Sequence, residues 1–276
     1  MKQLQLTYLG TNTVLFEKGS SSLLVDPHFT RPRLWALLRK IKPDPGRIIA
    51  ALRAFEIEQV DGVLLTHTHY DHALDAVDVV RTAGGVLCGS QSAVNLARGG
   101  GLTADHTQRV APGDELHMGD LYIRFHTAQH IHFPPPAAWL MPDRGVIKEG
   151  MTLPAMFWQY ACGDVLAIQV DRVLIFGSAA CQPGAYAGLD IDTVILGIGG
   201  LELKPQAYLE ALYHEIVLAS GASRVLLSHW DNFFRPLDDG LRPLGLAHHT
   251  IRKIKALADR DGLEVTILPF GTPVEL

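Results

Sequence analysis

Four of the six residues from 67 to 72, which read HTHYDH, carry side chains that bind metal ions. Imidazole nitrogen and carboxylate oxygen are the usual protein ligands of first-row transition metals. The apolar run just before them predicts a buried strand, and residues two apart on a strand face the same side. His67 and His69 can therefore reach one ion. Asp71 and His72 fall where the strand ends and can turn toward a second ion beside the first.

Histidines later in the chain can complete such a centre. His126, His130 and His132 lie within or just after an expected strand, and all three have the same parity. Strand geometry alone therefore leaves all three open as the third ligand of the first ion. His229 comes soon after the short expected strand 224–227, so it also lies at a strand end, where ligands from several strands can converge.

Strands followed by helices are expected in both halves of the chain, which implies a sheet-on-sheet core with helices outside. The expected strands are 3–8, 13–16, 23–25, 60–66, 86–88, 107–110, 121–127, 165–170, 173–177, 193–197, 224–227 and 263–268. The expected helices are 73–82, 205–219 and 248–259. Residues 30–58 read mostly as helix, because Trp35, Leu38 and Ile41 recur at helical spacing, and the prolines and glycine of residues 43–46 break this helix into two pieces.

Length and composition favour one large α/β domain over residues 1–276, with 47% hydrophobic residues to fill its core. The sequence has no apolar run of membrane-spanning length, and its start lacks the apolar region of a signal peptide. Its three cysteines, Cys88, Cys162 and Cys181, are scattered. A sparse, odd count argues against a disulfide framework, so we expect a cytoplasmic protein.

Two unusual segments are expected to cover the site as insertions near 30–58 and 133–160. Residues 31–53 hold seven cationic side chains against one acid, Asp44, in a chain whose net charge is −5. Such a segment can attract an anionic substrate or a membrane surface. Residues 133–160 are long, apolar and rich in proline, with Trp139 and Trp158 among them. Loops of this kind often form lids or binding walls.

The whole arrangement resembles the metallo-β-lactamase superfamily, and within it the stand-alone hydrolases similar to ascorbate-6-phosphate lactonase. The HTHYDH motif carries most of the likeness, together with a meander that ends in Val25-Asp26-Pro27 and histidines after later strands. The resemblance implies an αββα sandwich of two mixed sheets flanked by helices. It also implies one or two metal ions at one edge of the sheets. Zinc is the usual metal, and manganese or iron are alternatives.

The resemblance also assigns roles to residues of this sequence. His67 and His69 match the first-metal pair, and the stretch Ala128-Gln129-His130 is the context most similar to that of the third ligand, which favours His130. The second-metal ligands correspond to Asp71, His72 and His229, and Asp71 is also the expected catalytic residue. His28, after the strand end at Asp26-Pro27, and Trp230, beside His229, are expected near the substrate.

Position 178 departs from the superfamily pattern, which usually places a metal-bridging aspartate there. The corresponding stretch reads Phe176-Gly177-Ser178-Ala179. A neutral hydroxyl is a poorer ligand than a carboxylate and does not screen two cations from each other. We therefore expect the second metal site to be weaker than the first.

The resulting expectation is a metal-dependent hydrolase that uses a metal-bound hydroxide on a small-molecule ester, lactone or phosphoester, with an anionic substrate favoured by the cationic segment 31–53. Peripheral contact of that segment with a membrane is a second expectation. Superfamily members that process nucleic acids carry a further long domain, so a nucleic-acid partner is not expected. The alternatives are a non-catalytic member and a di-iron redox member of the same superfamily. The oligomeric state stays open.

Overall fold

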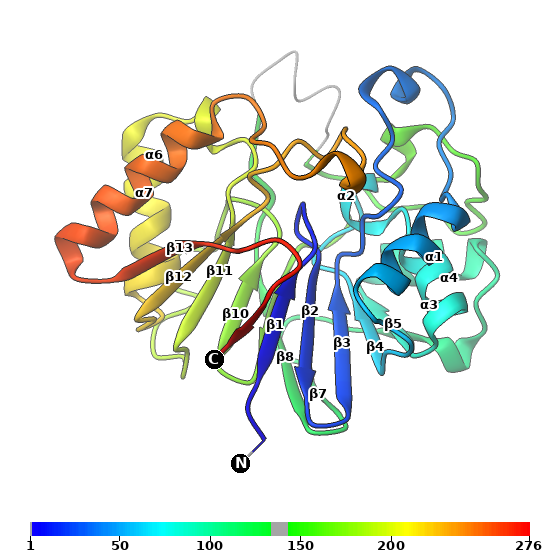
Figure 1. The fold of residues 1–276 in the computed structure, drawn as a ribbon, viewed down its shortest axis with the longest axis horizontal. Coiled ribbons are helices and arrows are strands. Elements are labelled where there is room, and N and C mark those ends of the chain that lie inside the picture. The colour runs from blue at the N-terminus through cyan, green and yellow to red at the C-terminus, as the bar shows by residue number, and fades with distance from the viewer. Residues whose placement is uncertain (1, 134–142) are drawn as a thin grey trace.

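Two seven-stranded sheets pack face to face in the computed structural model, which describes residues 2–133 and 143–276. Helices cover the outer face of each sheet, so that the layers are ordered helix, sheet, sheet, helix (Figure 1). The expected αββα sandwich of two mixed sheets flanked by helices is therefore confirmed.

The first sheet has the strand order β14-β1-β2-β3-β4-β5-β6. Its strands are β1 (Gln5–Tyr8), β2 (Val14–Lys18), β3 (Ser21–Val25), β4 (Gly62–Leu64), β5 (Val86–Gly89), β6 (Thr107–Arg109) and β14 (Pro273–Glu275). Neighbours are antiparallel from β14 to β3 and parallel from β3 to β6. The ends of β3 and β4 are in register, with Val25 opposite Leu64.

The second sheet has the order β13-β12-β11-β10-β9-β8-β7. Its strands are β7 (Glu115–Met118), β8 (Leu121–Thr127), β9 (Leu166–Val170), β10 (Val173–Phe176), β11 (Thr193–Gly197), β12 (Arg224–Ser228) and β13 (Glu264–Ile267). Neighbours are antiparallel from β7 to β10 and parallel from β10 to β13. The carboxyl ends of parallel strands meet at one edge of a sheet, so the loops after β10, β11 and β12 begin close to one another.

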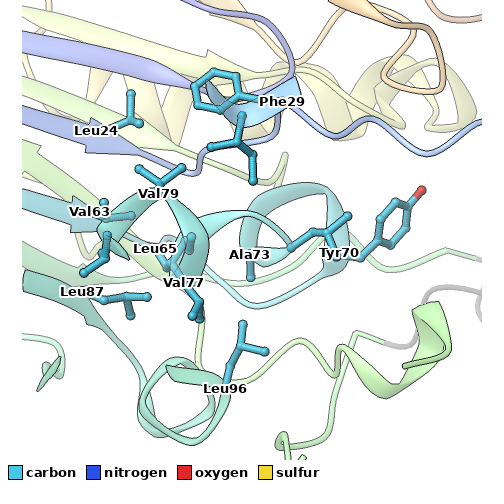
Figure 2. Close-up of a cluster of buried hydrophobic side chains, with 14 of the residues drawn as sticks. Leu24, Phe29, Val63, Leu65, Tyr70, Ala73, Val77, Val79, Leu87 and Leu96 are labelled. Carbon is cyan, nitrogen blue, oxygen red and sulfur yellow. The ribbon is translucent and has the colours of Figure 1, made fainter. Parts of the chain in front are cut away.

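Three apolar clusters separate the layers. The alternation along β3 shows how: Leu24 faces the helices, while Leu23 and Val25 face the second sheet. The first outer cluster lies under α1 (Pro45–Ala54), α3 (Ala76–Ala83) and α4 (Gln91–Gly99), as Figure 2 shows. The other outer cluster lies under α6 (Gln206–Tyr213), the π-helical turn η5 (His214–Leu218) and α7 (Ala247–Asp261). Strands buried on both faces read as continuous apolar runs.

The remaining helical elements are short. They are α2 (Tyr70–Ala73) and the 3₁₀ turns η1 (Leu34–Leu38), η2 (Ala104–His106), η3 (Phe157–Gln159), η4 (Leu201–Leu203) and η6 (Leu237–Asp239). Among the helices of residues 2–133 and 143–276, none is long and apolar enough to cross a membrane.

The main departure from the expected elements is in residues 30–58. The structure has only η1 and α1 there, and the helical spacing of Trp35, Leu38 and Ile41 does not mark one buried face. Trp35 and Leu38 are 63% and 83% exposed, whereas Ile41 is buried and pairs with Ala155. Strands β7 and β14 and helix α4 were not expected from the sequence. Residues 134–142 of the expected insertion, Trp139 included, lie outside the described residues.

Candidate metal centre

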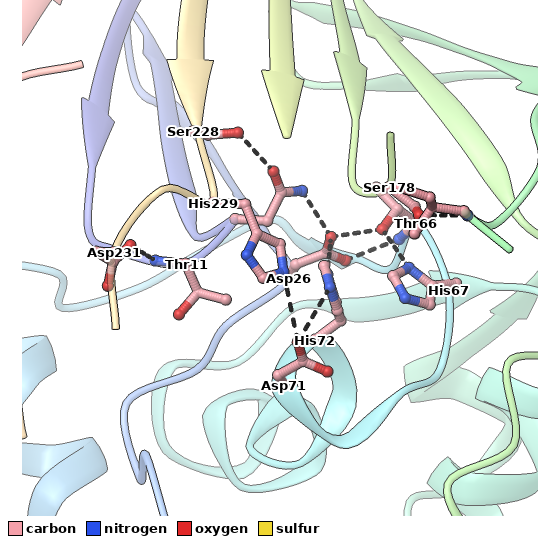
Figure 3. A network of polar contacts seen from close by, with 12 residues as sticks. Thr11, Asp26, Thr66, His67, Asp71, His72, Ser178, Ser228, His229 and Asp231 are labelled. Carbon is pink, nitrogen blue, oxygen red and sulfur yellow. Dashed lines mark hydrogen bonds and ion pairs between the residues drawn. The ribbon is translucent and has the colours of Figure 1, made fainter. Parts of the chain in front are cut away.

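The HTHYDH segment connects β4 to α2 at the edge where the two sheets end. His67 and His69 lie on the stretch after β4, and Asp71 and His72 lie in α2. Figure 3 shows His67, Asp71 and His72 at this edge. Thr68 points the other way, and its N–H donates to the Cys162 carbonyl over 2.9 Å. The hydrogen bond to Cys162 holds this stretch on one side. His67 and His69, on either side of Thr68, are directed to the opposite face.

Six side chains converge there in two groups of three. His67, His69 and His130 offer nitrogen atoms that lie within 4.8 Å of one another. The second group consists of Asp71 and His72 from α2 and His229 from the residue after β12, and its ligand atoms lie within the same 4.8 Å. The groups adjoin, because the ring centroids of His67 and His72 are 3.9 Å apart.

Only one of the three histidines left open by strand parity lies in this cluster. The His130 ring centroid is 5.1 Å from that of His67 and 4.5 Å from that of His69. His126 Nε2 instead lies 2.8 Å from Gln169 Oε1 on β9. His132 is exposed, and its Nδ1 lies 2.7 Å from Asp143 Oδ2.

A buried carboxylate that the sequence analysis did not single out, Asp26, holds the second group in place. Asp26 Oδ2 lies 2.8 Å from His72 Nδ1, which leaves His72 Nε2 directed toward Asp71. Thr66 donates to Asp26 through both its N–H and its hydroxyl, and Asn12 Nδ2 donates to Oδ2 over 2.8 Å. The side-chain oxygen Oδ1 of Asn12 in turn accepts from the hydroxyl of Ser228, the residue before His229. A carboxylate behind a ligating histidine commonly orients the ring in metal sites.

Burial keeps His67 and His130 of the first group neutral. Burial and then the neighbouring imidazoles of His72 and His69 hold the pKa of His67 well below its ordinary value. Burial and the nearby His69 lower the pKa of His130 to about 3. Neutral imidazole is the metal-binding form. Among the described residues, His67 Nε2 is buried and has no hydrogen-bond partner. A cation would satisfy this nitrogen, so the residues present fit a metal ion.

The second group carries the negative charge. Burial opposes the charge on Asp71, but the imidazoles of His72 and His229 hold the pKa of its carboxyl well below the ordinary value. Asp71 Oδ2 lies 3.4 Å from His229 Nε2 and 3.7 Å from His72 Nε2. Burial would lower the pKa of His72, yet the carboxylates Asp26 and Asp71 raise it above its ordinary value. A cation here would replace a proton on His72.

Ser178 lies at the wall of the same site, after β10. Its hydroxyl accepts a hydrogen bond from the Ile131 N–H over 3.0 Å. The chain passes so close to the Asp26 network that a Cβ on Gly177 would lie 2.1 Å from Thr66 Oγ1, which explains the glycine. Asp190 and Asp192, the other acids near this part of the sequence, both pair with Arg172 over 2.8 Å instead.

The two residues expected near the substrate are largely packed into the protein. His28 is fully buried, and its ring packs edge-on against Tyr70 and Phe233. Burial lowers the pKa of His28 to about 3, so the ring is neutral. Trp230 packs against Tyr8, with ring centroids 6.5 Å apart. Substrate contact by either residue stays a prediction.

A cavity of about 260 Å³ opens onto both groups of ligands. Beside the polar residues, its described walls are mainly apolar and come from Ile131, Phe133, Gly199, Gly200, Leu203, Phe233, Phe234 and Leu244. Glu202 is there, and no Lys or Arg is among the described lining residues. Of the two expected insertions, the described lining includes only Phe133, while Trp35 and Trp158 line separate hollows. Their role over the site stays a prediction.

A buried ion pair supports His229 from the other side. Arg31 and Asp231 are 1% and 0% exposed, and the Arg31 guanidinium donates to Asp231 Oδ2. Asp231 Oδ1 accepts from the Tyr8 hydroxyl and from the Thr11 N–H, each over 2.7 Å. The Thr11 carbonyl then accepts from the His229 N–H. His229 has φ of 54°, a strained value for a residue with a side chain, and this network holds it there.

A sequence model of the metallo-β-lactamase superfamily matches residues 6–138, the part that carries β1 to β8, the HTHYDH motif and His130. Over these residues the chain resembles the metallo-β-lactamase superfamily. The fold is similar to that of a solved structure along the whole chain. Igni18, a metallo hydrolase from Ignicoccus hospitalis, superposes with a TM-score of 0.58 over 99% of this chain and 98% of that one, at 17% identity.

Two curated proteins that this chain resembles are named as metal-dependent hydrolases. The protein from Staphylococcus carnosus is 26% identical over 166 residues, or 58% of this chain and 63% of its own length. The protein from Pyrobaculum neutrophilum is 26% identical over 186 residues, which is 63% of this chain and 75% of its own length. The chain thus spans less than two thirds of the first relative and three quarters of the second.

The Arg31–Asp231 pair generates a stability prediction. Asp231→Ala leaves a buried guanidinium without its counter-ion, so we expect the free energy of unfolding to fall by about 3–5 kcal/mol. Asp239→Ala removes a surface pair with Arg235 and should cost less than about 1 kcal/mol, since water screens that pair. Denaturant unfolding of both variants measures the difference. Equal, small losses would show that the buried pair is not a support of this site.

Proposed function

We propose that this protein is a metal-dependent hydrolase whose first ion is bound by His67, His69 and His130 and whose second is bound by Asp71, His72 and His229. The observation that carries the proposal is the convergence of two three-residue ligand groups at the floor of one cavity. The names of the two curated relatives support it. Zinc is the metal favoured by a set of three imidazole ligands.

The chemistry depends on the residues and the ion together. A zinc ion bound there would supply Lewis-acid chemistry, polarising a carbonyl or phosphoryl oxygen and lowering the pKa of water. Asp71 stays anionic at neutral pH because its pKa is low, and its Oδ1 has no hydrogen-bond partner among the described residues. An anionic carboxylate is suited to orient a water nucleophile by accepting a hydrogen bond from it. It is not suited to act as a protonated general acid.

The cavity walls favour an uncharged substrate. The expectation of an anionic substrate depended on the cationic segment 31–53, but no described residue of that segment lines the cavity, and Glu202 would repel an anion. Phe133, Phe233 and Phe234 offer apolar surface instead. We therefore propose a carboxylic ester or lactone with an apolar substituent, in preference to a phosphoester.

The ligand assignment is tested by removing His130 and comparing the result with that for a neighbouring histidine. His130→Ala should lower the zinc content and reduce hydrolysis by about two orders of magnitude or more, since a ligand matters at least as much as a residue that only orients one. His132→Ala, at an exposed site two residues away, is the matched control. This variant should keep the zinc content and the rate of hydrolysis of the wild type. Metal analysis and a panel of lactones, carboxylic esters and phosphodiesters provide the readouts.

Two outcomes would contradict the assignment. If His132→Ala lost zinc while His130→Ala retained it, the third ligand would be wrong. If the wild-type protein held two irons and turned over none of these substrates, the redox alternative would replace the hydrolase.

The two sites should also differ in their response to pH. His72 has a raised pKa and must lose a proton when a cation binds, whereas His67 and His130 have lowered pKa values and are already neutral. As the pH falls from about 8 to about 5.5, the affinity for the second zinc ion should decrease by up to about ten-fold per pH unit. The affinity for the first zinc ion should decrease much less. Calorimetric titration of stripped protein in buffers of different ionisation enthalpy tests this. Equal weakening of both equivalents would contradict it.

The neutral Ser178 should leave the second site weaker than the first, because no carboxylate screens the two cations from each other. Ser178→Asp is then expected to raise the second-site affinity and move the titration from one tight equivalent toward two. Ser178→Asn introduces a side chain of nearly the same size as aspartate but without its charge. This variant should bind the second ion like the wild type. Two tight equivalents in the wild-type protein would overturn the weak-site prediction.

A further inference from the structure

Three large apolar side chains on the loop between β3 and α1 are exposed to solvent. Leu34, Trp35 and Leu38 of η1 are 63%, 63% and 83% exposed, and we refer to them as the apolar tip. Figure 1 shows this blue loop with its short helical turn rising at the top right, clear of α1. No residue of the tip is among the described residues that line the cavity beside the ligand groups.

The clustering is what distinguishes the tip from ordinary surface. Among the described residues, ten large apolar side chains are exposed, and three of these fall within residues 34–38. Single exposed apolar side chains are normal, but contiguous ones usually mark a binding surface. The tip is also held outward by its neighbours. Leu37 and Ile41 are buried in the core, and Ile41 exchanges two backbone hydrogen bonds with Ala155, of 2.7 and 3.0 Å.

Unpaired positive charge surrounds the tip. Arg33, Arg39, Lys40 and Lys42 are all exposed. Within the described part of the chain, none of these four has an acidic group within ion-pairing distance. Asp44, the acid in this segment, pairs with Arg47 over 3.6 Å. The local charge is therefore positive although the chain as a whole is at −5.

We propose that the apolar tip inserts into the surface of an anionic phospholipid bilayer, with the four cations contacting lipid phosphates. Tryptophan and leucine partition into the membrane interface, and basic side chains beside them are attracted by anionic lipid. The proposal is independent of the hydrolase activity.

The shape and chemistry of the tip favour a membrane over other partners. A stable protein partner usually buries about 800 Å² on each side with matching shape, whereas this tip is a projection of a few side chains. Nucleic acid would use the cations but gain little from exposed Leu34 and Leu38. A fluid lipid interface needs no matching recess, and it satisfies both the apolar and the cationic groups. Beside the tip, Lys40, Lys148 and Trp158 line one hollow, so cationic and aromatic side chains continue next to it.

The test is vesicle flotation with the full chain. Vesicles of phosphatidylcholine alone are compared with vesicles of equal parts phosphatidylcholine and phosphatidylglycerol. We expect the wild-type protein to float only with the anionic vesicles and to be released at high salt. Trp35→Ser combined with Leu38→Ser should weaken binding about ten-fold or more through lost apolar contact. Arg39→Glu combined with Lys40→Glu should have an effect of similar size.

Matched controls separate the tip from general surface properties. Leu246→Ser removes another exposed apolar side chain, which is 54% exposed at the start of α7. Lys253→Glu combined with Lys255→Glu makes the same change in net charge on α7, where Lys255 is exposed. Both controls should float like the wild type. All changes are at surface positions, and the thermal midpoint of each variant checks that it is folded.

Two results would overturn the proposal. One is failure of the wild-type protein to float with anionic vesicles, or equal flotation of the tip variants and the controls. The other is a wild-type dimer in sedimentation equilibrium that the tip variant converts to a monomer without any vesicle binding. The tip would then be covered by a second copy of the chain. Because flotation does not depend on turnover, neither result bears on the proposed hydrolysis.

Discussion

The buried carboxylate of Asp26 ties together the parts of the chain that form the site. It accepts from Asn12 in the turn after β1 and from Thr66 at the start of the ligand segment, and it pairs with His72 in α2. Through Asn12 the network also reaches Ser228 at the end of β12 in the other sheet. A carboxylate with no exposed surface is costly unless every oxygen is paired, so these contacts constrain one another.

The pairing of buried polar groups also explains why the ligand side chains can be buried. Imidazoles at the sheet edge lose their solvation, and burial keeps His67 and His130 neutral. Negative charge is concentrated at Asp71 and Asp26 around His72. On the far side of His229, the Arg31–Asp231 pair holds its strained backbone through Thr11. The site is thus a rigid polar layer between apolar clusters, a setting in which a cation would be well matched.

Local patterns in the sequence predicted much of this arrangement. The HTHYDH spacing and the strand before it predicted that His67 and His69 share one face, and the apolar runs predicted most strands. The role of Asp26 was missed because its partners at positions 12, 66 and 72 are distant in sequence, and a carboxylate at a strand end carries no local signal. Arg31 was counted in a cationic surface, yet its partner lies 200 residues away and removes it from that surface.

The cavity was harder still to anticipate. Its walls come from single apolar residues after β8, β11 and β12, such as Phe133, Leu203 and Phe233, which look like ordinary core residues in the sequence. The tryptophans that drew attention instead line other hollows or lie outside the described residues. The periodicity around Trp35 was helical in spacing but not in burial, because only Leu37 and Ile41 of that stretch pack inward.

Anomalous diffraction from crystals of the zinc-loaded protein would show whether this sheet edge binds metal, since it locates the ion without reference to activity. We expect the strongest zinc peak among His67, His69 and His130, with zinc–nitrogen distances of about 2.0–2.1 Å. A weaker peak is expected among Asp71, His72 and His229. Zinc held at other side chains, with no peak among these six, would contradict the assignment of this sheet edge as a metal centre.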